Sequence, residues 1–217
     1  MKSLFLILFF LSVILHLAVS YVDLPKYRAI TKPFPLTLLL LYALACSGAS
    51  APFLLLALFT SLLGDVLLIF EGHVWFITGG ISFLLAHIFF IFVYNGALPE
   101  YPVLRIILPV SALYLCCSIL VIRLIRKNTP GSMLLPMWLY LLANSTMNVF
   151  ALLRFLKMGT PGAVLAFLGA FLFYVSDCLL FLVRFHPKKD LIPRKHFWVM
   201  FCYLMGEFLI TRGVLMH

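Results

Sequence analysis

The sequence has few charged residues. Only 11% of its 217 residues are Asp, Glu, Lys or Arg. A soluble globular domain carries about 25% charged residues, because its surface must be solvated. The composition therefore excludes a soluble enzyme, a nucleic-acid-binding domain and a disordered chain. With 65% apolar residues, 22 Phe and a mean hydropathy of +1.16, most of the chain is expected to lie in lipid.

Motifs for several kinds of catalytic site are also missing. HExxH, HxxxH, GxSxG and glycine-rich phosphate loops do not occur, so zinc-protease and serine-hydrolase chemistry have no support. The cysteines are odd in number, show no CxxC spacing and lie within apolar stretches. We interpret them as free thiols packed like small apolar residues: Cys46, Cys116, Cys117, Cys178 and Cys202.

Apolar stretches separated by short loops fill the chain. A membrane-spanning helix needs about 20 mostly apolar residues, and no room remains for a soluble domain. We therefore predict an all-α, polytopic membrane protein that forms one integral membrane domain over residues 1–217. The eight predicted transmembrane helices are 3–20, 34–47, 51–70, 74–94, 103–123, 133–153, 162–183 and 197–215, and the longest loops are 21–32 and 184–196.

The first of these stretches has a second interpretation. Lys2 precedes the apolar core, and Ala18-Val19-Ser20 resembles a signal-peptidase cleavage site. The apolar run is long for the core of a signal peptide, so we predict a span over residues 3–20.

Most cations lie in one set of loops. Of the 16 Lys and Arg residues, 11 follow the first, third, fifth and seventh predicted spans. Positively charged loops remain in the cytoplasm, so these loops are predicted to be cytoplasmic and both termini to lie on the opposite side. The net charge of +9 thus reflects membrane topology, and no nucleic-acid partner is expected. A bacterial inner membrane and the endoplasmic reticulum both fit.

One short pattern occurs in both halves of the chain. A small residue is followed by Asp, any residue and then Leu-Leu, once in the third predicted span and once in the seventh. The two copies are Gly64-Asp65-Val66-Leu67-Leu68 and Ser176-Asp177-Cys178-Leu179-Leu180. This match predicts a duplication into halves 1–98 and 99–217. Because each half holds four predicted helices, the two repeats run parallel to each other.

Each copy of the pattern places a carboxylate inside the membrane. Such a group costs about 2.5–3.5 kcal/mol on insertion, so it usually faces the bundle interior and has a function. Asp65 and Asp177 lie 14 and 15 residues into their predicted helices, which is about 21–22 Å at 1.5 Å per residue. We therefore expect the two carboxyls at nearly the same depth and, if the halves are symmetric, facing each other.

Two close carboxyls in a low dielectric cannot both ionise easily. One then stays protonated while the other is charged, which provides a general acid and a general base at neutral pH. We predict Asp65 and Asp177 to be this catalytic pair, and the sequence leaves open which of them is the acid.

Other polar side chains follow helical spacing in neighbouring spans. Asn144 and Asn148 are four residues apart and share a helix face, and Tyr203, Glu207 and Thr211 do the same in the last span. A simpler interpretation stays open, because side chains of this kind also join membrane helices by hydrogen bonds. A single buried histidine, such as His87 in the fourth span, is more often structural than catalytic.

The order of these motifs resembles the YhhN-like family, the lysoplasmalogenase family of small eight-span membrane proteins. The residues that carry the resemblance are Lys32-Pro33, Gly64-Asp65 with Leu67-Leu68, Phe76, Gly79 or Gly80, Phe83 and His87, Phe173-Tyr174 with Ser176-Asp177, Tyr203, Leu209-Ile210 and Gly213. The resemblance covers nearly the whole chain. One residue departs from it, since we expect a glutamine where the last span has Glu207.

The resemblance implies an enzyme that cleaves the vinyl-ether bond of lysoplasmalogens to a fatty aldehyde and glycerophosphoethanolamine or glycerophosphocholine. It implies Asp65 and Asp177 as the catalytic residues, and a half-protonated Asp pair also suits this chemistry, as the carboxyl pairs of glycosidases suit a related cation. The expected partners are the lysophospholipid and bilayer lipid, with no metal or organic cofactor, and the oligomeric state stays open. The residues expected to position substrate and water are Lys32, which would hold the phosphate, and His87, Asn144, Asn148, Tyr174 and Glu207.

Three alternatives remain at this point. A transporter or proton relay would also place Asp, Glu and His in the membrane. A metal-dependent lipid hydrolase would use Asp65, Asp177, Glu207 and His87 as ligands, although one histidine among carboxylates makes a poor zinc site. A lipid-binding or scaffold protein would tolerate Asn at both Asp positions.

Overall fold

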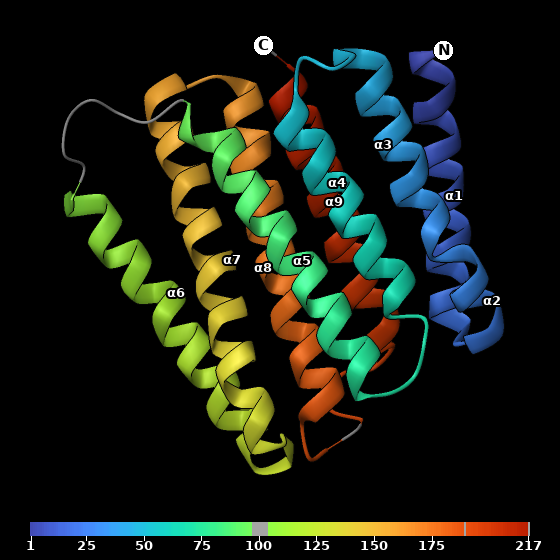
Figure 1. Cartoon of the computed structure of the whole chain (residues 1–217), viewed down its shortest axis with the longest axis vertical. Helices are drawn as coiled ribbons and strands as arrows, with labels where there is room; N and C mark the ends of the chain where they lie inside the picture. The colour runs from blue at the N-terminus through green and yellow to red at the C-terminus, as the bar shows by residue number, and fades with distance from the viewer. Residues whose placement is uncertain (97–103, 189, 217) are drawn as a thin grey trace.

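The computed structural model describes residues 1–96, 104–188 and 190–216. Its regular secondary structure in these ranges is helical, which confirms the predicted all-α class (Figure 1). The helices are α1 (Lys2–Val22), α2 (Pro25–Thr31), α3 (Pro33–Ser47), α4 (Pro52–Leu67), α5 (His73–Asn95), α6 (Leu104–Ile125), α7 (Gly131–Met158), α8 (Pro161–Phe185) and α9 (Lys195–Leu215), with a short 3-10 turn, η1, at Arg126–Asn128.

Proline and glycine set several helix boundaries. Pro33, Pro52 and Pro161 stand in the first turn of α3, α4 and α8, where a backbone N–H has no helical partner to lose. Gly48 ends α3 with a φ of 58°, and Gly159 ends α7 with a φ of 60°. Residues with a Cβ rarely adopt this left-handed region, so glycine allows the chain to turn sharply there.

The predicted loop 21–32 is largely helical, which corrects the sequence-based boundary. Pro25 begins α2, and Lys32 between α2 and α3 keeps helical backbone angles. The two helices therefore join directly, and Pro33 separates them by removing one backbone donor. This arrangement places Lys32 on helical backbone directly before the start of α3.

The chain is an integral multi-pass membrane protein. Within the described residues, seven helical stretches are long and apolar enough to cross a membrane: α1, α2 with α3, α5, α6 with η1, α7, α8 and α9. The remaining long helix, α4, has 16 residues, or about 24 Å at 1.5 Å per residue, which is less than the roughly 30 Å of a bilayer core. The count of eight spans therefore stays a prediction.

The start of α1 and the end of α9 lie at the same end of the bundle, which we call the terminal end (Figure 1). The predicted cytoplasmic side and the predicted repeat stay predictions, and the boundary of the halves at 98/99 lies outside the described residues. The five cysteines are free, as predicted.

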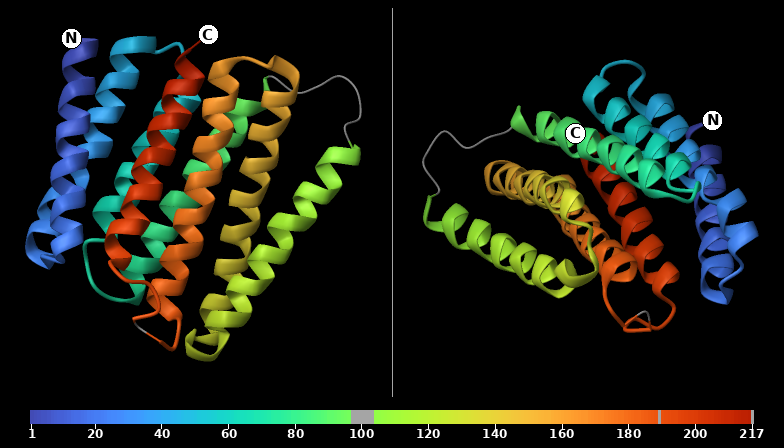
Figure 2. Two further views of the ribbon diagram at one scale, coloured as in Figure 1. Left: turned by 180° about the vertical axis from the view of Figure 1, so that it is seen from behind. Right: turned by 60° about the horizontal axis from the view of Figure 1, so that its bottom comes forward.

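The closest helix pairs are α4 with α5 and α8 with α9. Glycine makes both approaches possible, because a Cβ on Gly64 of α4 would lie 2.6 Å from the ring of Phe83 on α5. A Cβ on Gly169 of α8 would lie 2.6 Å from the carbonyl oxygen of Gly206 on α9. Helix α6 packs on α7 and α8, while α1 and α3 pack on α9 (Figure 2). The centre of the bundle is therefore formed by α4, α5, α7, α8 and α9.

Candidate active site

Asp65, near the end of α4, is held in a buried ion pair. Its side chain is 2% exposed, and its Oδ1 lies 3.3 Å from Nζ of Lys32. The hydroxyl of Tyr203 on α9 donates to the other carboxyl oxygen at 3.0 Å. An ammonium and a donated hydrogen bond both favour the charged form of a carboxyl, so these two partners offset part of the cost of burying an anion here.

Asp177 on α8 is equally buried but has different partners. The amide of Asn144 on α7 donates to Oδ2 at 2.6 Å. The Nε2 atom of His87 on α5 lies 3.4 Å from the same oxygen. Neither partner carries a fixed charge, and the 3.4 Å approach of the imidazole is longer than the hydrogen bond from Asn144. Asp177 therefore differs from Asp65 in having no cation with a fixed charge among these partners.

A chain of hydrogen bonds holds Asn144 in place. The amide of Asn148 donates at 3.0 Å to the side-chain oxygen of Asn144, and the hydroxyl of Tyr114 on α6 donates at 3.0 Å to Asn148. The hydroxyl of Tyr174 on α8 donates to the backbone oxygen of Tyr114 at 3.0 Å and lies 2.9 Å from the hydroxyl of Ser118. Asn148 and Tyr174, predicted as substrate-binding residues, are thus connected to Asp177 by hydrogen bonds through other residues.

Aromatic rings lie between the two aspartates. The ring of Phe173 packs at 5.3 Å from that of Tyr203 and at 4.9 Å from that of His87. No hydrogen bond joins the two carboxyls, and each is held by its own set of described residues. The expectation that the two carboxyls face each other stays a prediction, and each aspartate has its own partners, with Lys32 paired to Asp65.

Glu207 on α9 adds a third carboxyl. It is fully buried, and neither oxygen makes a hydrogen bond with a described residue. The hydroxyl of Ser61 on α4 lies beside it without hydrogen-bonding geometry, and both Asp65 and Asp177 are within electrostatic range. Glu207 is therefore a buried carboxyl that interacts electrostatically with both aspartates.

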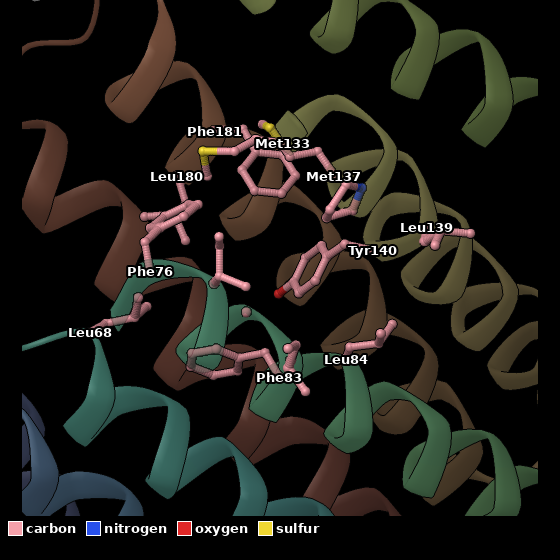
Figure 3. A pocket seen from close by; sticks show the side chains of 14 residues that line it. Leu68, Phe76, Phe83, Leu84, Met133, Met137, Leu139, Tyr140, Leu180 and Phe181 are labelled. Atoms are coloured by element: carbon pink, nitrogen blue, oxygen red, sulfur yellow. The ribbon is translucent and has the colours of Figure 1, made fainter. Parts of the chain in front are cut away.

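An apolar cavity opens beside Tyr140, and neither aspartate is among its lining residues. It has a volume of about 250 Å³ and is lined from α5, α7 and α8 (Figure 3). Its wall includes Ile81 and Leu139, which are both 52% exposed on the outside of the bundle, so the cavity opens sideways toward lipid. On the inner side stands Tyr140, whose hydroxyl points into the space in Figure 3. Tyr140 packs on His87 at 5.1 Å between ring centres and lies beside Asp177.

Sequence reasoning did not single out Tyr140, although a signal for it existed. It lies four residues before Asn144 and eight before Asn148, so all three share one face of α7. Among the described residues, no group of three or more His, Cys, Asp or Glu side chains is arranged to hold a metal ion.

Comparison with known proteins gives one match. A model of the YhhN family matches residues 27–214, which is most of the chain. The comparisons with curated proteins and with solved structures found no match. The matched range contains Lys32, both aspartates, His87 and Glu207.

Proposed function

Because the chain belongs to the YhhN family, we propose that it is a lysoplasmalogenase-type hydrolase that cleaves the vinyl-ether bond of lysoplasmalogens. The products are a fatty aldehyde and glycerophosphoethanolamine or glycerophosphocholine. One observation carries the proposal: a cavity that opens toward lipid ends at Tyr140, beside a buried carboxyl–imidazole pair formed by Asp177 and His87.

The cavity suits the alkyl chain of a single-chain lipid. Its volume of about 250 Å³ and its apolar wall give space for part of an alkyl chain. Met133, Met137 and Phe181 supply adaptable apolar contacts around it. An alkyl chain that enters between α5 and α7 places the carbons nearest its vinyl-ether bond at Tyr140. The rest of a longer alkyl chain stays in the bilayer.

Asp177 then acts as the general acid. It gives its proton to the alkene carbon farther from the ether oxygen, and that oxygen shares its lone pair to form an oxocarbenium ion. The anion of Asp65 favours this cation electrostatically from the other side of Phe173. His87 and Asn144 orient the carboxyl that loses the proton.

Water completes the reaction. It adds to the oxocarbenium carbon and returns a proton to the Asp177 carboxylate, which gives a hemiacetal. The hemiacetal hydroxyl loses its proton while the glycerol oxygen gains one, and the carbon–oxygen bond breaks. One water molecule is consumed, and nothing is oxidised or reduced.

The test is aldehyde release from a synthetic lysoplasmalogen by the purified protein, compared with Asp177→Asn and Asp65→Asn. Release by the wild type and loss in both variants is expected. A parallel reaction with a chelator distinguishes a metal-dependent hydrolase, because that alternative predicts loss of activity and recovery with one metal. No aldehyde from either the ethanolamine or the choline substrate would contradict the proposal and favour a transport assay.

A further inference from the structure

A second cavity lies at the terminal end of the bundle. It has a volume of about 460 Å³ and is lined by the end of α3 and the start of α4 together with residues of α5, α7 and α9. Its polar wall contains Ser47, Ser50 and Arg154. The guanidinium of Arg154 donates to the backbone oxygen of Val93 at 3.5 Å. A buried cation and two hydroxyls make this cavity suitable for water, unlike the apolar cavity beside Tyr140.

Buried polar side chains continue from this cavity toward the aspartates. The hydroxyls of Tyr94, Ser61 and Thr211 and both oxygens of Glu207 are fully buried, and none has a hydrogen-bond partner among the described residues. Tyr94 directly follows Val93, which lines the cavity, and it interacts electrostatically with both Arg154 and Glu207. We call Tyr94, Ser61, Thr211 and Glu207 the polar column.

Helical spacing gives the polar column a direction. Thr211 is four residues after Glu207, and Leu215, which lines the second cavity, is four residues further on. These three positions share one face of α9. From Glu207 to Leu215 the helix rises about 12 Å. On α4, Ser61 lies two turns after Leu54, which also lines the cavity.

We propose that the polar column is the route by which water reaches the reaction from the terminal end, and that Glu207 holds the water that attacks. This inference rests on the proposed hydrolase function for its reaction. Buried polar groups without protein partners are satisfied by water, and about four water molecules spaced at ~2.8 Å span the 12 Å. Glu207 interacts electrostatically with both aspartates, and neither of its oxygens has a hydrogen-bond partner among the described residues.

The two proposed routes reach the site from different directions. The apolar cavity admits the alkyl chain sideways through Ile81 and Leu139, while the column brings water along the bundle axis. Water therefore arrives at the carboxyls without crossing the space that the chain fills.

The test is cysteine labelling of the purified protein in detergent, with the five native cysteines replaced by alanine. Thr211→Cys faces the column, and the matched control Ile210→Cys is one residue away and equally buried, but packs on Gly169 of α8. The probe is 2-aminoethyl methanethiosulfonate, and mass spectrometry follows the modification. We expect Thr211→Cys to react at least about 10-fold faster than Ile210→Cys.

Equal rates at the two positions overturn the proposal. Ser61→Cys on the opposite wall provides a second test if Thr211→Cys does not fold, and it is expected to react more slowly than Thr211→Cys because it is deeper. No reaction at Ser61→Cys in a folded protein also overturns the proposal. Thr211→Val is expected to lower kcat about 10-fold with the lipid KM unchanged, which a purely structural role does not predict.

Labelling and activity separate the two proposals. Labelling of Thr211→Cys without aldehyde release by the wild type supports the column and overturns the hydrolase function. Aldehyde release by the wild type without labelling at either column position overturns the column alone.

Discussion

Asp65 and Asp177 occupy equivalent places in the repeated sequence pattern, but their environments differ. Asp65 has an ammonium at 3.3 Å and a phenol at 3.0 Å. Asp177 has an amide at 2.6 Å and an imidazole at 3.4 Å. A fixed positive charge favours an anion, whereas the amide of Asn144 carries no charge. The same sequence motif thus lies in two different electrostatic environments, set by residues on other helices.

The partners that distinguish the two aspartates come from other helices and not from the aspartate motif itself. Lys32 comes from the α2–α3 junction, while His87 and Asn144 come from α5 and α7. Changing a partner should therefore change the role, which the following experiments examine.

Asp177→Asn should have the largest effect on activity. Removing a general acid typically costs 10²–10⁴-fold, and we expect a loss of about 1,000-fold in kcat with an unchanged melting temperature. Asparagine keeps an oxygen that Asn144 can donate to, so the fold is preserved. Aldehyde release and thermal unfolding measure the two quantities, and a variant that retains more than a tenth of the wild-type kcat contradicts the role.

Asp65→Asn should reduce both activity and stability. The loss of the anion leaves Lys32 largely buried without its partner, and an unpaired buried group costs about 1–3 kcal/mol. We expect a lower melting temperature together with a lower kcat. The double variant Lys32→Met with Asp65→Asn should be more stable than Asp65→Asn alone, because it removes both charges. Equal melting temperatures of the single and double variants would show that the ion pair is not what distinguishes Asp65.

Part of this arrangement could be predicted from the sequence. The lengths of the apolar stretches and the positions of prolines predicted the bounds of each long helix to within a few residues, because both signals are local in the sequence. The spacing of Asn144 and Asn148 correctly indicated a polar face on α7. The pairing of Lys32 with Asp65 could not be predicted, since periodicity describes faces within one helix and not the packing of neighbouring helices.

Substitutions along the chain of hydrogen bonds that holds Asp177 should have graded effects. Asn144→Ala removes the direct donor to the carboxyl, and we expect about a 100-fold loss of kcat. Asn148→Ala acts one hydrogen bond further away, with about a 10-fold loss, and Ser118→Ala lies at the far end, with less than about a 2-fold loss. Each value falls within or below the range for groups that assist proton transfer. Equal losses at all three positions, accompanied by unfolding, would indicate a structural network only.

The smallest effect on kcat is expected from filling the apolar cavity. A Cβ on Gly80 meets no atom within 4 Å, and Gly80 lines the cavity, so Gly80→Leu can direct its side chain into that space. Leucine adds four carbons, and each methylene excluded from an apolar site costs about 0.8 kcal/mol. We expect the preferred alkyl chain to shorten by about four carbons, with kcat for short chains nearly unchanged. Gly131→Leu is the matched control, because its Cβ is also unobstructed but lies outside the cavity lining. If both variants shift the preferred alkyl length alike, the alkyl chain is bound elsewhere and this cavity does not hold it.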